Sequence, residues 1–216
     1  MRRLARCLSA TALCWLFAGS AAHERPPSES PGPSAPSATP APSAEVQTFL
    51  AWLAQTQDHE GRSFAVLDKR QAQLWLFDEK RRPLGSTPVL LGTARGDASV
   101  PGIGERALST IRPEERTTPA GRFALEPGVN DTGEDIFWVD YAAAVSLHRV
   151  RANKPAERRL QRLATPTPAD NRISYGCINV PAAYYDQHLR PRFSLGRGVL
   201  YVLPETLPLQ RLFNSR

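Results

Sequence analysis

Short apolar runs separated by polar or turn-forming segments dominate the chain from residue 64 to residue 203. Segments 64–68 and 73–77 are rich in β-branched and aromatic residues and flank a short, mainly polar stretch, which predicts a hairpin of two strands. Turn-forming residues gather between the later runs, at 92–104 and 126–133. The pattern predicts further strands at 88–91, 121–125, 136–147 and 198–203.

Helical spacing is confined to a few short segments. Apolar residues from Val46 to Leu53 predict an amphipathic helix over 45–57. Segments 154–164 and 181–189 each have a proline in the first turn, which predicts two more short helices. Successive short strands with few helices favour a mainly β domain, a sandwich or a partly closed barrel.

The first 22 residues have the pattern of a secretory signal peptide, with an arginine-rich start and small residues at the end. The apolar run between them, 8–18, has about 11 residues, whereas a membrane-spanning helix needs roughly 20. No second run of this kind follows, so we expect no transmembrane segment. A lipid anchor is the alternative, but neither Cys7 nor Cys14 follows the small residue that lipoprotein processing requires.

Segment 23–44 is rich in Pro, Ser and Ala and predicts an extended linker, which leaves 45–216 as one domain. The formal charge is +6, from 27 basic and 21 acidic residues. Removal of the signal peptide takes away three arginines, and 24 − 21 leaves +3. This balance argues against a nucleic-acid partner, and it suits either an anionic cell wall or mere solubility. We expect a monomer.

Of the three cysteines, Cys7 and Cys14 lie in the signal peptide, so the mature chain keeps Cys177 alone. An exported single thiol has no partner for an internal disulfide and is at risk of mispairing, so its retention needs a reason. A buried structural cysteine and a nucleophile are equal alternatives on this ground alone. The preceding Gly176 leaves room for a substrate carbonyl and for backbone N–H groups that face a developing oxyanion.

A strand-like run, 138–147, ends at His148. An imidazole beside a thiol accepts its proton and later returns it to the leaving amine. Among the four histidines, His23 lies in the linker, His59 follows the first helix and His188 lies in a polar stretch. His148 is therefore the natural partner of the thiol.

His148 and the run Ser174-Tyr175-Gly176-Cys177-Ile178-Asn179 together resemble the L,D-transpeptidase (YkuD-type) catalytic domain. The signature of that family is a His at a strand end, a loop, and then Ser/Thr-His-Gly-Cys, a hydrophobic residue, and Asn or Arg. The resemblance extends over most of residues 64–203. It includes the early hairpin, the strand that ends at Gly92, the Thr-Pro-x-Gly turn at 118–121, and the closing strand.

The resemblance implies a YkuD-like β-sandwich or partly closed barrel, with Cys177 as the nucleophile and His148 as the base. It implies that Ser174, or the backbone carbonyl that follows His148, orients the imidazole. The N–H groups of Gly176 and Cys177 would form part of an oxyanion hole. Asn179 would support the loop or the substrate.

The implied reaction is attack on a carbonyl of a peptidoglycan tetrapeptide stem in the periplasm. D-Ala is released, a thioester forms at Cys177, and an amine from a second stem resolves it. Crosslinking, remodelling or attachment of a protein to the wall would follow. No metal or organic cofactor is implied. Resolution of the same thioester by water would instead give a carboxypeptidase or a crosslink-cleaving amidase.

Two departures from the family pattern stand out. Tyr175 replaces the His before the glycine, which leaves His148 as the sole candidate base and admits a wall-binding domain without catalysis as a further alternative. The interval from His148 to Ser174 is 26 positions, longer than the usual pattern. The extra segment, 150–173, borders the site either as a lid or as a solvated insertion.

Overall fold

The computed structural model describes residues 41–213, all of which lie within one compact unit of the chain. The predicted signal peptide and most of the predicted linker lie outside the described residues. Within them no helix is long and apolar enough to cross a membrane. The strands are β1 (Phe64–Asp68), β2 (Gln73–Phe77), β3 (Pro83–Pro88), β4 (Leu91–Gly92), β5 (Gly121–Val129), β6 (Asp135–Asp140), β7 (Val145–Arg149), β8 (Arg172–Ser174), β9 (Ile178–Val180) and β10 (Gly198–Val202).

Helical segments are short, apart from the first. The α-helices are α1 (Ala44–Thr56), α2 (Arg159–Ala164), α3 (Ala182–Tyr184), α4 (Arg190–Phe193) and α5 (Gln210–Phe213). The 3₁₀ turns are η1 (Ile103–Glu105), η2 (Leu108–Thr110), η3 (Pro113–Glu115), η4 (Pro155–Glu157) and η5 (Pro168–Asn171), and the π-helical turn η6 (Tyr185–Leu189) joins α3 to α4.

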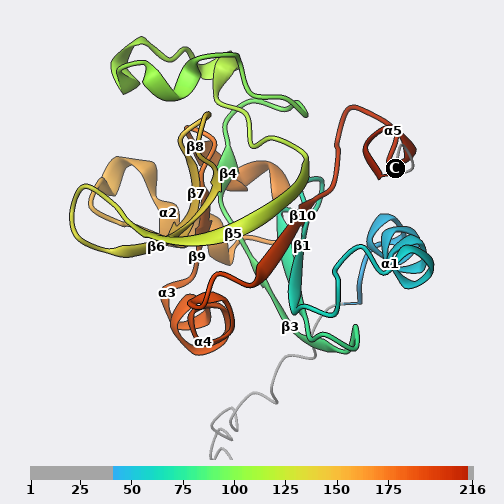
Figure 1. The fold of residues 1–216 in the computed structure, drawn as a ribbon. Coiled ribbons are helices and arrows are strands. Elements are labelled where there is room, and N and C mark those ends of the chain that lie inside the picture. Colours follow the sequence, from blue (N-terminus) through green and yellow to red (C-terminus); the bar gives the residue numbers. More distant parts are fainter. Residues whose placement is uncertain (1–40, 214–216) are drawn as a thin grey trace, which may run out of the picture. The chain divides into compact units, whose positions relative to one another are not determined.

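Eight of these strands form one sheet in the order β3-β2-β1-β10-β5-β6-β7-β9, and β4 pairs with β8 (Figure 1). The two edges of this sheet approach each other. Leu90, just after the edge strand β3, exchanges two backbone hydrogen bonds of 2.9 Å with Asn179 on the opposite edge strand β9. The sheet therefore curls into a partly closed barrel, and the predicted mainly β fold is confirmed.

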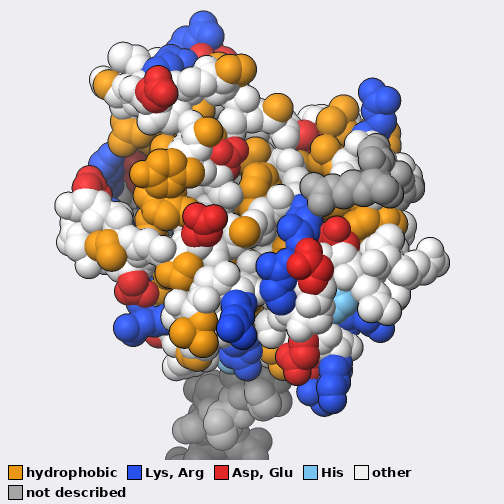
Figure 2. All heavy atoms as spheres, in the orientation of Figure 1, with side chains coloured by type: hydrophobic (Ala, Val, Ile, Leu, Met, Phe, Trp, Pro, Cys, Tyr) orange, Lys and Arg blue, Asp and Glu red, His pale blue; other side chains and the backbone are white. Residues whose placement is uncertain are grey.

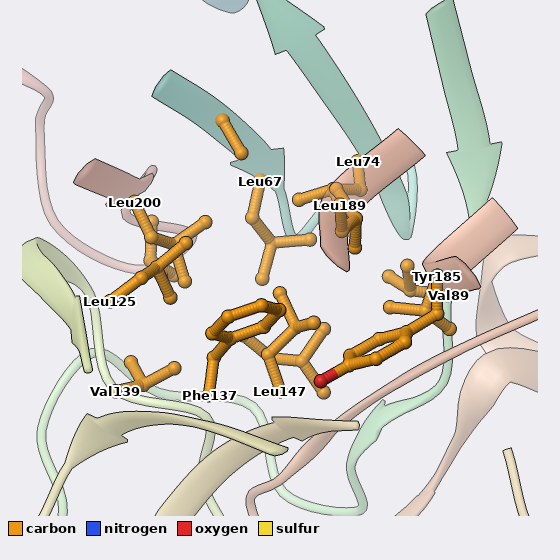
Figure 3. Close-up of a cluster of buried hydrophobic side chains, with 14 of the residues drawn as sticks. Leu67, Leu74, Val89, Leu125, Phe137, Val139, Leu147, Tyr185, Leu189 and Leu200 are labelled. Carbon is orange, nitrogen blue, oxygen red and sulfur yellow. The ribbon is translucent and has the colours of Figure 1, made fainter. Parts of the chain in front are cut away.

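The inner face of the curled sheet encloses the main hydrophobic core, which the run α3-η6-α4 completes (Figure 3). Strand alternation sends every second side chain inward. Among its fully or almost fully buried members are Leu67, Leu74, Val89, Leu125, Phe137, Val139, Leu147, Tyr185, Leu189 and Leu200.

A second core lies on the outer face of β1, β2 and β10, where α1 and α5 cover the sheet (Figure 1). Ser43 caps α1, since its hydroxyl accepts a hydrogen bond from the N–H of Val46. Phe49 on α1 packs against Tyr201 and Phe213, with ring centroids 4.8 and 4.9 Å apart. The amphipathic helix expected over 45–57 therefore forms, one residue earlier.

Several strand expectations are wrong. The segment 88–91, expected to be one strand, instead joins β3, which ends at Pro88, to β4, which begins at Leu91. Pro83 and Gly85 hide the strand pattern of β3, and they are tolerated because β3 is an edge strand. The single run expected over 136–147 is instead the hairpin of β6 and β7. Its turn, 141–144, has no Gly or Pro to mark it, and Ala144 takes the left-handed conformation (φ 53°). β5 also continues to Val129, through residues expected to form a turn.

A buried group of charges connects the β1–β2 turn with the C-terminal segment. The Lys69 ammonium, fully buried, lies 2.9 Å from Asp97 and 3.7 Å from Glu205. Arg172, at the start of β8, pairs with Glu205 at 2.6 Å. Burial lowers the pKa of Lys69, and these acids oppose that effect. Elsewhere basic and acidic side chains are intermingled, as the face drawn in Figure 2 shows.

Candidate active site

Adjacent parallel strands bring the two predicted chemical groups together. In the β7–β9 pair His148 lies opposite Asn179 and Leu147 lies opposite Ile178. Leu147 and Ile178 point into the core. Since side chains alternate along a strand, His148, Asn179 and the preceding Cys177 lie on the other face. A thiol and an imidazole that are far apart in sequence therefore reach one surface.

This surface forms the floor of a cleft of about 300 Å³. The loop between β4 and β5, which carries η1 and η2, forms one wall, and the segment after β7 forms another. Among the described residues that line the cleft, four are Lys or Arg and none is Asp or Glu. The lining residues are Ile103, Gly104, Arg106, Leu108, Ile111, Ala143, Ala144, His148, Arg151, Asn153, Lys154, Arg159, Ser174, Tyr175, Cys177 and Asn179.

All four of these cations have acidic partners outside the lining, and the ammonium of Lys154 lies 3.8 Å from Glu157. Arg106 pairs with Glu115 at 2.9 Å, and Arg151 pairs with Glu134 at 2.6 Å. Arg159 pairs with Glu157 at 2.5 Å. The cleft is therefore weakly rather than strongly basic.

Gly176 adopts a backbone conformation that only glycine takes readily, with φ +131°. A Cβ at this position would lie 2.9 Å from the carbonyl oxygen of Thr117 and 3.3 Å from the side chain of Val145. Glycine is thus required here by both the torsion and the space, and it turns the chain so that Cys177 enters the cleft.

Hydroxyl groups fix this loop from two sides. The Ser174 hydroxyl donates to the carbonyl of Cys177 (2.6 Å) and accepts from the N–H of Gly176 (3.1 Å). The Thr118 hydroxyl donates to the carbonyl of Gly176 (2.8 Å) and accepts from the N–H of Gly92 (2.9 Å). Ser174 therefore braces the loop, and no described contact joins it to His148.

These bonds also bear on the expected oxyanion donors. The N–H of Gly176 is engaged by Ser174, so it is not free to bind a substrate oxygen in this state. The N–H of Cys177 has no side-chain acceptor in the described part of the chain. Cys177 therefore stays the candidate donor within the loop, and the oxyanion role expected of Gly176 would require its hydrogen bond to Ser174 to open.

The Cys177 sulfur lies half-buried at the end of the β6–β7 hairpin. It accepts from the N–H of Ser146 (3.4 Å), and the Ser146 hydroxyl lies 3.6 Å away. The carbonyl of Ala144 lies 3.7 Å from the sulfur and can accept the thiol proton. An N–H that points at sulfur stabilises a thiolate. Ser146 was missed because a serine two residues before the histidine has no recognisable signal in the sequence.

The backbone after His148 orients its ring. Nδ1 lies 2.7 Å from the carbonyl oxygen of Arg149. A carbonyl only accepts, so the Nδ1 proton is donated to it and Nε2 keeps a lone pair. Burial lowers the pKa of His148, and the nearby Arg151 and Arg159 lower it further. The imidazole is therefore neutral near pH 7 and able to accept a proton.

Asn179 connects the imidazole to the loop. Its side-chain nitrogen lies 3.4 Å from His148 Nε2 and 3.3 Å from the carbonyl oxygen of Cys177. Its side-chain oxygen accepts from the guanidinium of Arg159. Arg159 was not among the expected site residues, because the extra segment was left open as either a lid or a solvated insertion.

The ring of Tyr175 packs against Arg116. The Arg116 guanidinium carbon lies 3.9 Å from the centre of its ring. Arg116 itself is tied to the carbonyl of Ile111, a residue of the cleft wall. Tyr175 therefore joins the loop that carries Cys177 to the wall formed by 103–111.

Within residues 41–213 no three His, Cys, Asp or Glu side chains gather as a metal-binding group. No protein-family model matches the chain, and no curated protein matches it. Among solved structures, it is similar to the NMR structure of the catalytic domain from the E. faecium L,D-transpeptidase. The identity is 17%, the match covers 66% of this chain and 98% of that chain, and the TM-score is 0.38. Similarity of this extent does not place the chain in a family.

Proposed function

We propose that this chain is a cysteine-dependent L,D-transpeptidase that acts on peptidoglycan stem peptides in the periplasm. The observation that carries the proposal is that Cys177 and the neutral imidazole of His148 line the same cleft. The loop that carries Gly176 and Cys177 is held by the hydroxyl groups of Thr118 and Ser174, and a site for acyl transfer requires such a fixed nucleophile. The motif resemblance supplies the substrate class.

The reaction begins with transfer of the thiol proton from Cys177 to Nε2 of His148. In the described state Asn179 contacts Nε2, so a rotation of the thiol or of the amide precedes this step. The thiolate then attacks the donor carbonyl, and the N–H of Cys177 faces the oxyanion. The C–N bond breaks, the imidazolium protonates the leaving D-Ala, and a thioester remains.

The second half restores the enzyme. An amine of the acceptor stem loses a proton to His148 and attacks the thioester carbonyl. A new amide bond forms as the C–S bond breaks, and the sulfur recovers its proton. The cations that line the cleft suit the carboxylates of stem peptides, because charge-assisted hydrogen bonds to carboxylate are the stronger kind.

Incubation of the purified protein with tetrapeptide muropeptides tests the proposal. We expect release of D-Ala together with crosslinked dimers, and neither product from Cys177→Ala. Equal product formation by the two proteins would contradict the proposal. Release of D-Ala without dimers at any acceptor concentration would assign hydrolysis instead, and binding to peptidoglycan without any product would assign a wall-binding domain.

A further inference from the structure

The side-chain amide of Asn179 is held between two groups of opposite hydrogen-bonding character. Its oxygen accepts from the Nη1 of Arg159, and its nitrogen faces Nε2 of His148 at 3.4 Å. A guanidinium has only donors, so the amide oxygen must face Arg159. The amide nitrogen, which has only donors, must then face His148.

This chain of donors and acceptors extends to the ring of His148. A donor on the Asn179 nitrogen requires a lone pair on Nε2, which places the ring proton on Nδ1. The carbonyl of Arg149, an obligatory acceptor, receives that proton at 2.7 Å. From Arg159 through Asn179 and His148 to Arg149, each donor thus faces an acceptor.

We propose that Arg159 is a positioning residue that acts through Asn179 to hold His148 in the tautomer with an unprotonated Nε2. The kinetic meaning of this role rests on the proposed function, since Nε2 is the atom that accepts the thiol proton. The tautomer itself does not depend on catalysis. The extra segment between His148 and Ser174 therefore contributes to the site rather than only bordering it.

The structure holds Arg159 firmly enough for this role. Its side chain is only 14% exposed, and it bonds to Glu157 in the preceding turn η4. α2 is anchored by Leu163, which is buried, and by Arg162, which donates to the carbonyls of Glu157 and Asp170. A fixed guanidinium loses little entropy when it orders a neighbouring amide.

The charges that face His148 act in the same sense. Arg151, on the segment after β7, and Arg159, on α2, both disfavour the imidazolium, whereas Glu134, beyond the end of β5, favours it. Loss of Arg159 would release the amide and also remove one of the two opposing cations. Both effects would favour protonation of Nε2.

Side-chain ¹⁵N NMR of the full-length protein measures this directly. The His148 signals are assigned by their loss in His148→Gln. We expect a pyridine-type Nε2 and a pyrrole-type Nδ1 in the wild type above neutral pH. In Arg159→Met we expect the two nitrogens to average toward a mixture in which the tautomer with a protonated Nε2 predominates, and Arg159→Lys, which keeps a donor, to retain the wild-type pattern.

Two further variants separate this role from a general effect on α2. Arg162→Met removes a cation of the same helix that does not contact Asn179, so it should leave the ¹⁵N pattern unchanged. Asn179→Asp keeps the acceptor for Arg159 but has no donor for Nε2, so it should shift the proton to Nε2. An unchanged pattern in both Arg159→Met and Asn179→Asp would overturn the proposal.

Kinetics distinguish this inference from the proposed function. Arg159→Met should lower the single-turnover acylation rate of Cys177 about tenfold, the equivalent of about 1.4 kcal/mol, with little change in substrate KM. A rate within twofold of the wild type would overturn the kinetic part. A wild type that forms no acyl-enzyme would contradict the proposed function and leave the ¹⁵N result to decide the tautomer.

Discussion

The hydroxyl of Thr118 donates a hydrogen bond of 2.8 Å to the carbonyl of Gly176, which lies 58 residues further along the chain. The same hydroxyl accepts from the N–H of Gly92, and all three groups are buried. One side chain therefore links β4, the turn before β5 and the loop that carries Cys177. The position of the thiol depends on packing behind the cleft as much as on the residues inside it.

Replacement of Thr118 by Val should destabilise the fold by about 1–3 kcal/mol. The change keeps the shape but leaves the carbonyl of Gly176 and the N–H of Gly92 buried without a partner. Urea unfolding monitored by tryptophan fluorescence measures the change. Thr48→Val is the control, since the Thr48 hydroxyl is exposed on α1 and its loss should cost about 0.5 kcal/mol or less. Equal effects of the two substitutions would contradict the bracing role.

Gly176→Ala should destabilise the loop and slow alkylation of Cys177 by iodoacetamide. The new Cβ meets the carbonyl of Thr117 at 2.9 Å, in addition to about 1–3 kcal/mol of backbone strain. Gly133→Ala is a matched control, because Gly133 also has positive φ (82°) but nothing within 4 Å of its Cβ position. A Gly176→Ala variant with the melting temperature and alkylation rate of the wild type would rule out the steric requirement.

Lys69→Met should cost about 3–5 kcal/mol of unfolding free energy, since it leaves Asp97 buried without its cation and leaves Glu205 with Arg172 alone. Arg82→Met removes an ion pair whose arginine is 70% exposed, and it should cost less than about 1 kcal/mol. Denaturant titrations of both variants check the difference. If Lys69→Met unfolds at the wild-type midpoint, the buried charges do not support the fold.

The stability of the wild type should include a contribution from His148 that depends on pH. Burial lowers the pKa of His148 in the folded chain below the ordinary 6.5, so the unfolded chain takes up this proton first. The contribution is present above pH 6.5 and is lost as the pH falls below that value toward the folded pKa. The unfolding free energy of wild type minus that of His148→Gln should therefore decrease from pH 7.5 to pH 5. A difference that is constant or rises over this range would contradict the shift.

The sequence predicted the parts of this fold that local pattern determines. The hairpin of β1 and β2, the first helix and the closing strand follow from apolar periodicity, and all three form. Cys177 and His148 were expected to be neighbours, and the pairing of β7 with β9 brings their strands together. Each of these expectations needed only a strong apolar run or a motif.

The contacts that orient the site could not be predicted in this way. Arg159 reaches Asn179 only because the extra segment folds back to line the cleft, and charge alone does not distinguish it from a solvated arginine. Ser146 contacts the sulfur because the unmarked turn 141–144 reverses the chain just before it. Thr118 braces Gly176 across 58 residues. These relationships arise from tertiary packing rather than from local propensity.

The central claim is that Cys177 is a nucleophile that becomes acylated. Its most direct test is the intact mass of the protein after exposure to a carbapenem, a known acylating agent of the L,D-transpeptidase family. We predict an increase equal to one carbapenem, mapped by peptide analysis to Cys177 and absent in Cys177→Ala. An unmodified wild-type mass, or an adduct mapped to another residue, would contradict the account.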